Sequence, residues 1–369
     1  MHSFTTVFNN YSWEETLDSI YRKTPDDVLR AIYTPKRSLE DFKALLSPAA
    51  SQYVKLMAEE SRRLTLKRFG KTIQLYIPLY LSNECQNICT YCGFSYDNKL
   101  ERKTLTDAEL LAEAEFVKSM GYRHVLLVSG EANQTVGVDY FENALKLIGP
   151  VFDHVSMEVQ PLDEHEYKKL MSHGLENVLV YQETYHREDY KIHHPKGKKS
   201  NFDYRLETPD RIGRAGVRKM GLGVLLGLDD WRADCFFTGL HVNYLEKAYW
   251  KTQYGISFPR LRPCSGGLPP KLPVSDRDFV QIISAYRLFK PEIELSLSTR
   301  ETPEFRDQLI HLGITSMSAG SKTNPGGYTV ASQSLEQFEI SDERKVPDVI
   351  QAIKSQGYEP VWKDWDKTF

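Results

Sequence analysis

Eight short apolar segments recur between residues 72 and 323, and an amphipathic, charge-bearing stretch separates each segment from the next. This alternation is typical of repeated βαβ units, which build a parallel sheet. Eight units over about 250 residues correspond to a complete barrel, so we predict an α/β chain with a (β/α)8 TIM-type fold. The expected strands are 73–82, 124–131, 154–161, 177–184, 221–228, 255–263, 292–301 and 316–323.

The regions between these segments carry helix signals. Thr106 begins a capping box, TDAE, and Gly121 marks the end of the helix that follows. Outside the barrel, 72–330, the pattern predicts a helical N-terminal extension over 1–71 and a short helix with a tail over 331–369. Within the barrel, further helices are expected at 163–173, 204–220, 230–254, 275–289 and 302–312.

Three cysteines, Cys85, Cys89 and Cys92, follow the first expected strand in the run ECQNICTYCGF. A 4Fe-4S cluster ordinarily takes four thiolates, so three close cysteines predict a cluster with one iron open to a small molecule. A structural zinc site usually needs two cysteine pairs or added histidines, and the sequence nearby offers neither. The zinc alternative is therefore disfavoured.

Composition limits the class of protein. The two remaining cysteines, Cys235 and Cys264, are isolated, and an odd total argues against a disulfide framework, so we expect a cytoplasmic protein. A net charge of -3 gives no electrostatic reason to expect nucleic acid or an anionic membrane as a partner. The first residues lack the basic head and apolar core of a signal peptide, and no apolar run approaches membrane-spanning length.

Polar residues finish several of the expected strands. Barrel enzymes place their chemistry at the C-terminal strand ends, and charged groups are costly at buried strand positions, so these residues predict a site. The alternative is an ion pair that closes the barrel rim. The basic loop 193–201 reads equally as a solvated loop or as a lid over this end. The strand-end residues are Ser129, Gly130, Glu131, Glu158, Gln160, Gln182, Glu183, Thr184, Ser298, Thr299, Arg300 and Glu301.

The CxxxCxxC pattern, with Tyr91 just before its last cysteine, resembles the radical S-adenosylmethionine (SAM) superfamily. The resemblance implies that the amino and carboxylate groups of SAM occupy the open iron. It also implies that the reduced cluster cleaves SAM to methionine and a 5'-deoxyadenosyl radical, which is chemistry of the cofactor.

The same resemblance implies a set of SAM contacts. Ser129, Gly130 and Glu131 resemble the Gly-Gly-Glu-type element that approaches the methionyl amino group. Arg205 is the candidate partner of the SAM carboxylate, because a guanidinium offers two parallel donors, although a salt bridge on a helix surface is the alternative. Glu158 and Glu183 are candidates for the ribose or amino group, and Leu225 and Leu226 for packing on adenine or in the core.

A larger set of motifs narrows the resemblance. The set ECQNICTYCGF, LLVSGEAN, VSMEVQPL, VYQETYH, GLGVLLGL, FPRLRP, LSLSTRE and SAGSKTNPGGY resembles the radical SAM aromatic amino acid lyases, above all the tyrosine lyases of thiamine thiazole biosynthesis. It covers roughly residues 70–330 and the tail. The resemblance implies cleavage of the Cα–Cβ bond of L-tyrosine to 2-iminoacetate and p-cresol. It further implies a ferredoxin- or flavodoxin-like electron donor and a thiazole synthase that takes up the product.

Strands seven and eight of a barrel end side by side, so Arg300 and Ser318 are expected to converge on the carboxylate of tyrosine. Glu301 and Tyr328 are candidates for orienting its amino group or ring. Aromatic residues of the tail either contact the thiazole synthase or close the barrel, and they are Tyr358, Trp362 and Trp365.

Related activities stay open as alternatives. The tyrosine lyase of hydrogenase maturation carries a second cluster on a C-terminal cysteine triplet, and it is disfavoured because no cysteine follows Cys264. Tryptophan lyases of thiopeptide biosynthesis and deazaflavin synthases differ in a few side chains at the barrel mouth. Sulfur insertion of the biotin-synthase type is also disfavoured, because the sequence shows no second cysteine set for an auxiliary cluster. A non-catalytic iron-sulfur or zinc protein is the alternative from another class.

Overall fold

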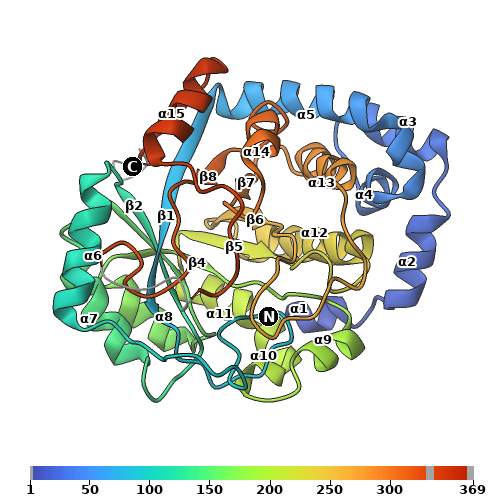
Figure 1. Cartoon of the computed structure of the whole chain (residues 1–369). Helices are drawn as coiled ribbons and strands as arrows, with labels where there is room; N and C mark the ends of the chain where they lie inside the picture. Colours follow the sequence, from blue (N-terminus) through green and yellow to red (C-terminus); the bar gives the residue numbers. More distant parts are fainter. Residues whose placement is uncertain (1–2, 330–335, 364–369) are drawn as a thin grey trace.

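The computed structural model describes residues 3–329 and 336–363 (Figure 1). Eight parallel strands form a closed barrel, because β1 hydrogen-bonds to β2 on one side and to β8 on the other. The predicted (β/α)8 fold is confirmed, and each expected segment overlaps a strand. The strands are β1 (Thr72–Ser82), β2 (His124–Ser129), β3 (His154–Glu158), β4 (Leu175–Leu179), β5 (Lys219–Gly223), β6 (Gln253–Ser257), β7 (Glu294–Leu297) and β8 (Ser316–Ser318).

Most strands are shorter at their C-terminal ends than the sequence predicts. β7, for example, ends at Leu297, whereas the expected strand continued through a polar run to Glu301, four residues later. In β7, strand pairing stops just before this polar run, which lies in the loop at one mouth of the barrel. The residues by which β7 was overestimated, 298–301, all line the cavity described below.

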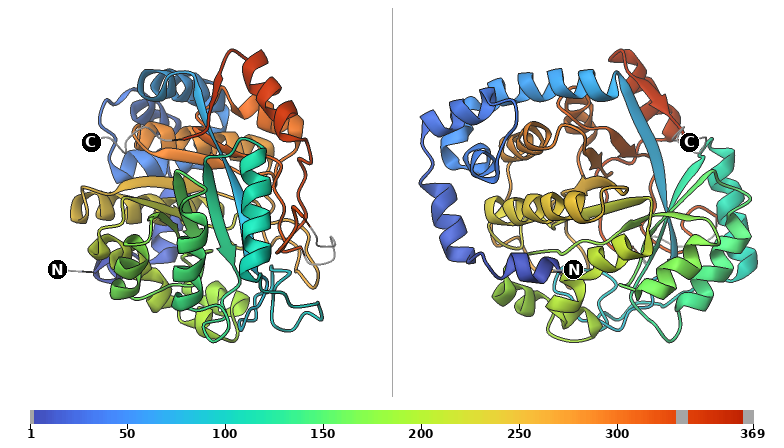
Figure 2. Two further views of the ribbon diagram at one scale, coloured as in Figure 1. Left: turned by 90° about the vertical axis from the view of Figure 1, so that its left-hand side faces the viewer. Right: turned by 180° about the vertical axis from the view of Figure 1, so that it is seen from behind.

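Helices on the outside cover the barrel (Figure 2). The capping box at Thr106 is present, with reciprocal bonds to Glu109. The helix expected over 204–220 is instead two helices, since Pro209 starts a second helix and Gly216 ends it in the left-handed region at φ 83°. The covering helices are α6 (Asp107–Ser119), α7 (Val138–Ile148), α8 (Glu164–Met171), α9 (Arg187–His193), α10 (Phe202–Leu206), α11 (Thr208–Ala215), α12 (Trp231–Ala248), α13 (Asp276–Phe289) and α14 (Pro303–Leu309).

The N-terminal extension is helical, as expected, and arches over α12 and α13 (Figure 2). Phe42 stacks on Phe289 with ring centroids 4.4 Å apart. Gly239 of α12 permits this approach, because a Cβ there would lie 2.4 Å from the Phe42 ring. The extension consists of α1 (Phe4–Phe8), α2 (Trp13–Tyr21), α3 (Pro25–Tyr33), α4 (Leu39–Leu46), the 3-10 helix η1 (Pro48–Tyr53) and α5 (Val54–Phe69).

The C-terminal region folds back along β1. After α15 (Val346–Ser355), a short strand, β9 (Glu359–Val361), pairs in parallel with the start of β1, and the sequence pattern did not predict it. Tyr358 is buried, and Trp362 packs edge-on against Tyr122 with centroids 5.2 Å apart. These two tail aromatics therefore close the side of the barrel, whereas Trp365 lies outside the described residues.

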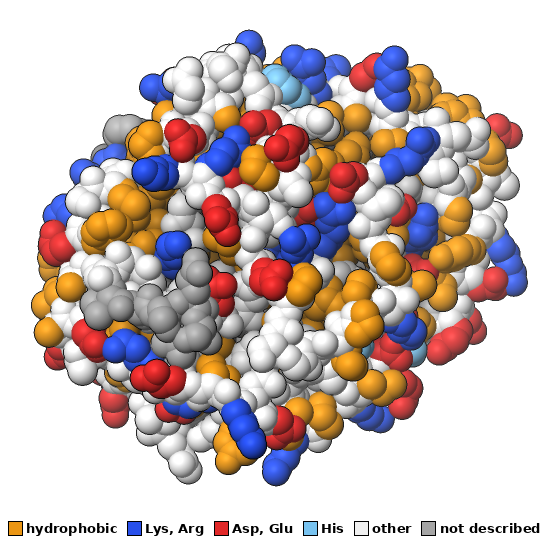
Figure 3. Space-filling view, viewed as in Figure 1, with side chains coloured by type: hydrophobic (Ala, Val, Ile, Leu, Met, Phe, Trp, Pro, Cys, Tyr) orange, Lys and Arg blue, Asp and Glu red, His pale blue; other side chains and the backbone are white. Residues whose placement is uncertain are grey.

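Within the described ranges, no helix has the length and apolarity that crossing a bilayer requires. Side chains of both charge signs are interspersed over the face seen in Figure 3. This surface agrees with the near-balanced charge of the sequence.

A buried ion pair fastens the chain beyond β8 to the barrel. Arg306 of α14 pairs with Asp342, and both side chains are fully buried. Arg306 also donates to the carbonyl oxygen of Ser318 at the end of β8. The pair therefore holds the segment that precedes α15 against the strand end that carries Ser318.

Replacement of Asp342 by Asn is expected to destabilise the fold, because Arg306 would keep a buried charge without a counter-charge. The expected loss in the free energy of unfolding is about 3 kcal/mol, measured by urea denaturation. Asp307→Asn is the control, because Asp307 pairs with Arg344 in a partly exposed position and should cost below about 1 kcal/mol. Equal losses in the two variants would contradict this account.

Candidate active site

A cavity opens at the C-terminal ends of the strands. It brings together most of the predicted site residues. Leu226 is not among its lining residues and packs in the core, and Tyr328 instead donates its hydroxyl to the carbonyl oxygen of Pro78 at 2.6 Å. The predicted residues that line the cavity are Cys85, Cys89, Tyr91, Cys92, Ser129, Gly130, Glu131, Glu158, Glu183, Arg205, Leu225, Ser298, Thr299, Arg300, Glu301 and Ser318. Three predicted strand-end residues, Gln160, Gln182 and Thr184, are buried and do not line it.

The cysteine loop follows β1 and is held by bonds to its own backbone. The guanidinium of Arg102 donates to the carbonyl oxygens of Asn83, Phe94 and Ser95 at 2.6, 2.9 and 2.8 Å. The backbone N–H of Gly130 donates to Ser82 at 3.0 Å, which ties the end of β2 to the beginning of the loop. A Cβ on Gly130 would lie 2.1 Å from the carbonyl oxygen of Glu84, so this close approach requires glycine.

The three thiols share one environment. Cys85, Cys89 and Cys92 are all free, and they face the same cavity. Burial raises the pKa of each thiol, in Cys92 to about 11. The amide nitrogen of Gln337 donates to the sulfur of Cys92 at 3.6 Å.

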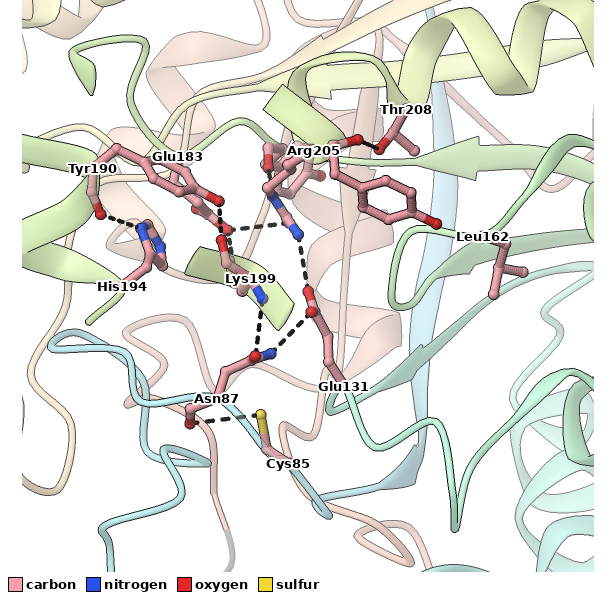
Figure 4. A network of polar contacts seen from close by, with 12 residues as sticks. Cys85, Asn87, Glu131, Leu162, Glu183, Tyr190, His194, Lys199, Arg205 and Thr208 are labelled. Atoms are coloured by element: carbon pink, nitrogen blue, oxygen red, sulfur yellow. Dashed lines mark hydrogen bonds and ion pairs between the residues drawn. The ribbon is translucent and has the colours of Figure 1, made fainter. Parts of the chain in front are cut away.

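A chain of alternating charges forms the wall beside the loop (Figure 4). Arg205 pairs with Glu131 at 2.9 Å and lies 3.6 Å from Glu183, which also pairs with Lys199 at 2.7 Å. Burial alone would raise the pKa of Glu183, but Lys199 and Arg205 hold that pKa below its usual value. Arg205 is only 6% exposed, so the alternative of a salt bridge on a helix surface is wrong.

Arg205 has little free donor capacity. Its Nε donates to the carbonyl oxygen of Tyr181 at 2.6 Å, while its two terminal nitrogens face Glu131 and Glu183. Asn87 of the cysteine loop adds to this network by donating to Glu131 at 2.9 Å. The guanidinium therefore organises the two carboxylates and joins them to the cysteine loop.

Lys199 is a site residue that sequence analysis missed. It belongs to the basic loop 193–201, in which residues 195, 196, 198, 200 and 201 are exposed while Lys199 lines the cavity. His194 of this loop is buried and bonds the hydroxyl of Tyr91 at 2.6 Å, and Asn87 accepts from the backbone N–H of Lys199 at 3.0 Å. Nothing in the sequence distinguishes Lys199 from Lys198 beside it; only packing selects it.

The opposite wall presents Arg300. The face of Phe338 lies 3.4 Å from the centre of its guanidinium, and one terminal nitrogen donates to the carbonyl oxygen of Arg260 at 3.4 Å. No carboxylate of residues 3–329 or 336–363 lies within ion-pair distance of Arg300, whose pKa is lowered by burial. Arg300 is thus a cation in the cavity wall that no carboxylate of the described residues neutralises directly.

Two carboxylates near Arg300 differ in environment. Glu301 is buried and takes several bonds from Arg260, two of them at 3.0 Å, so its oxygens serve to fix Arg260. Glu158 lines the cavity, and its pKa is raised to about 7, first by burial and then by the negative charge of Glu183. Glu301 is therefore placed to support Arg300 through Arg260.

Comparison with known proteins identifies the family. Residues 79–236 match the Radical SAM superfamily, and residues 257–359 match the Biotin and Thiamin Synthesis associated domain. The chain is 50% identical to the 2-iminoacetate synthase of Escherichia coli (strain K12) over 367 residues, which cover 99% of this chain and 97% of that protein. The chain belongs to the 2-iminoacetate synthase family. The family resemblance predicted from the motifs is thus confirmed.

Other similarities agree with membership of the 2-iminoacetate synthase family. The 2-iminoacetate synthase of Salmonella typhimurium (strain LT2) is 49% identical over 99% of this chain and 97% of its own. The solved structure of HydG, a maturase of the [FeFe]-hydrogenase, superposes with a TM-score of 0.90 at 33% identity. That match covers 95% of this chain and 79% of HydG.

Radical SAM enzymes use a 4Fe-4S cluster and SAM, and the cavity of this family member fits both. Three free thiols from one loop supply the donors for the cluster. The buried hydroxyls of Ser129 and Ser321 line the cavity and have no hydrogen-bond partner in the described part of the chain. Buried polar groups are normally paired, so these hydroxyls fit the presence of a polar ligand.

Gly130→Ala is expected to displace the cysteine loop, because its Cβ would overlap the carbonyl oxygen of Glu84 and approach the Cβ of Cys85 to 3.2 Å. Overpacking of this kind costs about 1–3 kcal/mol. The variant should lose most of its iron after anaerobic reconstitution. Gly255→Ala is the control, because its Cβ would make only an ordinary contact at 3.6 Å. Full iron retention in Gly130→Ala would contradict the close approach.

Proposed function

We propose that this chain cleaves the Cα–Cβ bond of L-tyrosine, giving 2-iminoacetate and p-cresol for thiamine thiazole biosynthesis, while SAM is converted to methionine and 5'-deoxyadenosine. Identity of 50% to a 2-iminoacetate synthase over nearly the whole chain supports the reaction. The observation that carries the substrate assignment is Arg300, a cavity-facing cation without a carboxylate partner among the described residues.

Cys85, Cys89 and Cys92 would hold the 4Fe-4S cluster. When bound, the cluster and SAM supply the 5'-deoxyadenosyl radical that abstracts hydrogen from the substrate. The cysteine loop, joined to Glu131 by Asn87, sets where these thiols lie.

The charged wall would bind SAM. The ammonium of Lys199 has three N–H donors, and its one ion pair among the described residues is with Glu183. Lys199 therefore has donors left for the SAM carboxylate and is a better candidate for that contact than Arg205. Arg205, paired with Glu131 and close to Glu183, would instead orient these two carboxylates toward the amino and ribose groups. Leu225 is buried and lines the cavity, where its side chain offers an apolar surface to adenine.

The substrate carboxylate would pair with Arg300, assisted by the hydroxyl of Ser318. The Ser318 carbonyl oxygen is already taken by Arg306, and the residue lines the cavity. Phe338 on one side and Arg260 on the other limit the rotation of the Arg300 guanidinium. A fixed fork orients the amino group of tyrosine as well as neutralising its carboxylate.

The hydrogenase-maturase reaction is the second candidate, because HydG shares the fold at 33% identity. The higher identity to 2-iminoacetate synthases, 50% over 99% of this chain, favours the first. Tryptophan as substrate stays an alternative, and product analysis after anaerobic incubation with SAM, a reductant and each aromatic amino acid decides it. Formation of p-cresol from tyrosine supports the proposal, and its absence overturns it.

Two protein partners belong to the proposal. An imine of glyoxylate hydrolyses readily, so direct transfer to a thiazole synthase would preserve it, and a ferredoxin- or flavodoxin-like protein would supply the electron. Both partners imply a cytoplasmic location. The thiazole synthase is expected to co-purify with this chain at micromolar concentration; normal pathway flux without any association would contradict the contact.

Arg300→Lys should keep a positive charge but lose the planar fork. Misplacement of a substrate by about 1 Å can reduce rates about 10²-fold, so p-cresol formation is expected to fall by about this factor. Arg123→Lys, on the exposed surface, is the matched control and should retain the normal rate. Unchanged tyrosine cleavage in Arg300→Lys would remove Arg300 from the substrate site.

Each of Cys85→Ala, Cys89→Ala and Cys92→Ala should abolish both cluster assembly and SAM cleavage, because a cluster needs its thiolates. Cys264→Ala should keep about four irons per chain, because this thiol does not line the cavity. Iron analysis after anaerobic reconstitution checks both. A triple variant at positions 85, 89 and 92 that retained its iron would disprove the ligand assignment.

A further inference from the structure

The side chain of Gln337 bridges the barrel and the cysteine loop. Its amide nitrogen lies 3.6 Å from the sulfur of Cys92, and its amide oxygen accepts from the hydroxyl of Tyr80 at 2.7 Å. The two contacts define the orientation of the amide. In this orientation the amide N–H faces the sulfur, whereas the reversed orientation would present an oxygen, which cannot donate to a thiolate.

The backbone of Gln337 is fixed to the same loop. Its carbonyl oxygen accepts from the N–H of Gly93, the residue after Cys92, at 2.9 Å, and its own N–H donates to Thr323 at 2.9 Å. A Cβ on Gly93 would lie 2.6 Å from this carbonyl oxygen, so the close contact depends on glycine. Main chain and side chain of one residue therefore both bind the part of the loop that carries Cys92.

Hydrogen bonds to cluster sulfurs change the reduction potential of an iron-sulfur cluster. When the cluster gains one electron, negative charge increases on its sulfurs, and an N–H donor stabilises that charge. The donor of Gln337 is neutral, held in place and partly shielded from water. It should favour the reduced state over the oxidised state.

We propose that Gln337 is a positioning residue that acts through Cys92. Its amide N–H donates to the Cys92 thiolate in the loaded enzyme and raises the reduction potential of the cluster. The inference rests on the proposed function, because it requires the cluster on Cys85, Cys89 and Cys92. The next residue, Phe338, contacts Arg300, so one short segment supports both the cluster ligand and the substrate cation.

The test is a potentiometric titration of the reconstituted full chain with dithionite, followed by the electron paramagnetic resonance (EPR) signal of the reduced cluster. In Gln337→Leu, the ratio of reduced to oxidised cluster at a fixed potential should fall about tenfold, equivalent to about 59 mV for one electron. Tyr80→Phe keeps the amide but removes its anchor, so a smaller shift in the same direction is expected. An exchangeable proton coupled to the reduced cluster should disappear in Gln337→Leu.

Gln308→Leu makes the same substitution on the exposed side of α14 and should leave the potential unchanged. An unchanged potential in Gln337→Leu, with full iron content, would overturn the proposal. If Gln337→Leu does not retain iron, Tyr80→Phe takes its place, and an unchanged reduction potential in Tyr80→Phe with full iron content would overturn the proposal. A wild-type chain that assembles no cluster would instead overturn the proposed function, so the two failures are distinguishable.

Discussion

Hydrogen bonding of β1 to both β2 and β8 closes the sheet, and the site depends on this closure. The cysteine loop leaves the end of β1, whereas Arg300 and Ser318 lie more than 200 residues later at the ends of β7 and β8. Closure brings these strand ends to one mouth, across a single cavity. The buried pair of Arg306 and Asp342 then holds the segment that carries Gln337 and Phe338 over the same mouth.

The two walls of this cavity differ in how far their charged side chains neutralise one another. On the wall beside the cysteine loop, Arg205 and Lys199 neutralise Glu131 and Glu183 within the protein. On the opposite wall, Arg300 has no direct carboxylate partner among the described residues, while Glu158 has its pKa raised to about 7. A partly buried cation is costly without an anion, so the second wall is the part of the site that a ligand completes. This difference is the physical basis for assigning tyrosine to Arg300.

Much of this arrangement was predictable from sequence. Apolar runs located all eight strands, and the polar residues at their ends included many of those that line the cavity, because a barrel places strand ends together. Features set by packing were not predictable. Pro209 divided an expected helix, and β9 has only three residues, too few to show a periodic pattern. Lys199 and Gln337 reach the site from loops, where neither apolar periodicity nor spacing indicates which side chain turns inward.

The central claim is that three protein thiolates hold a cluster whose fourth ligand is SAM. The most direct measurement is EPR spectroscopy of the anaerobically reconstituted, reduced chain with and without SAM. The account predicts a reduced 4Fe-4S signal that changes when SAM is added, because SAM binds the iron that lacks a cysteine. A reduced-cluster signal that stays the same with SAM would contradict it and favour a non-catalytic iron-sulfur protein.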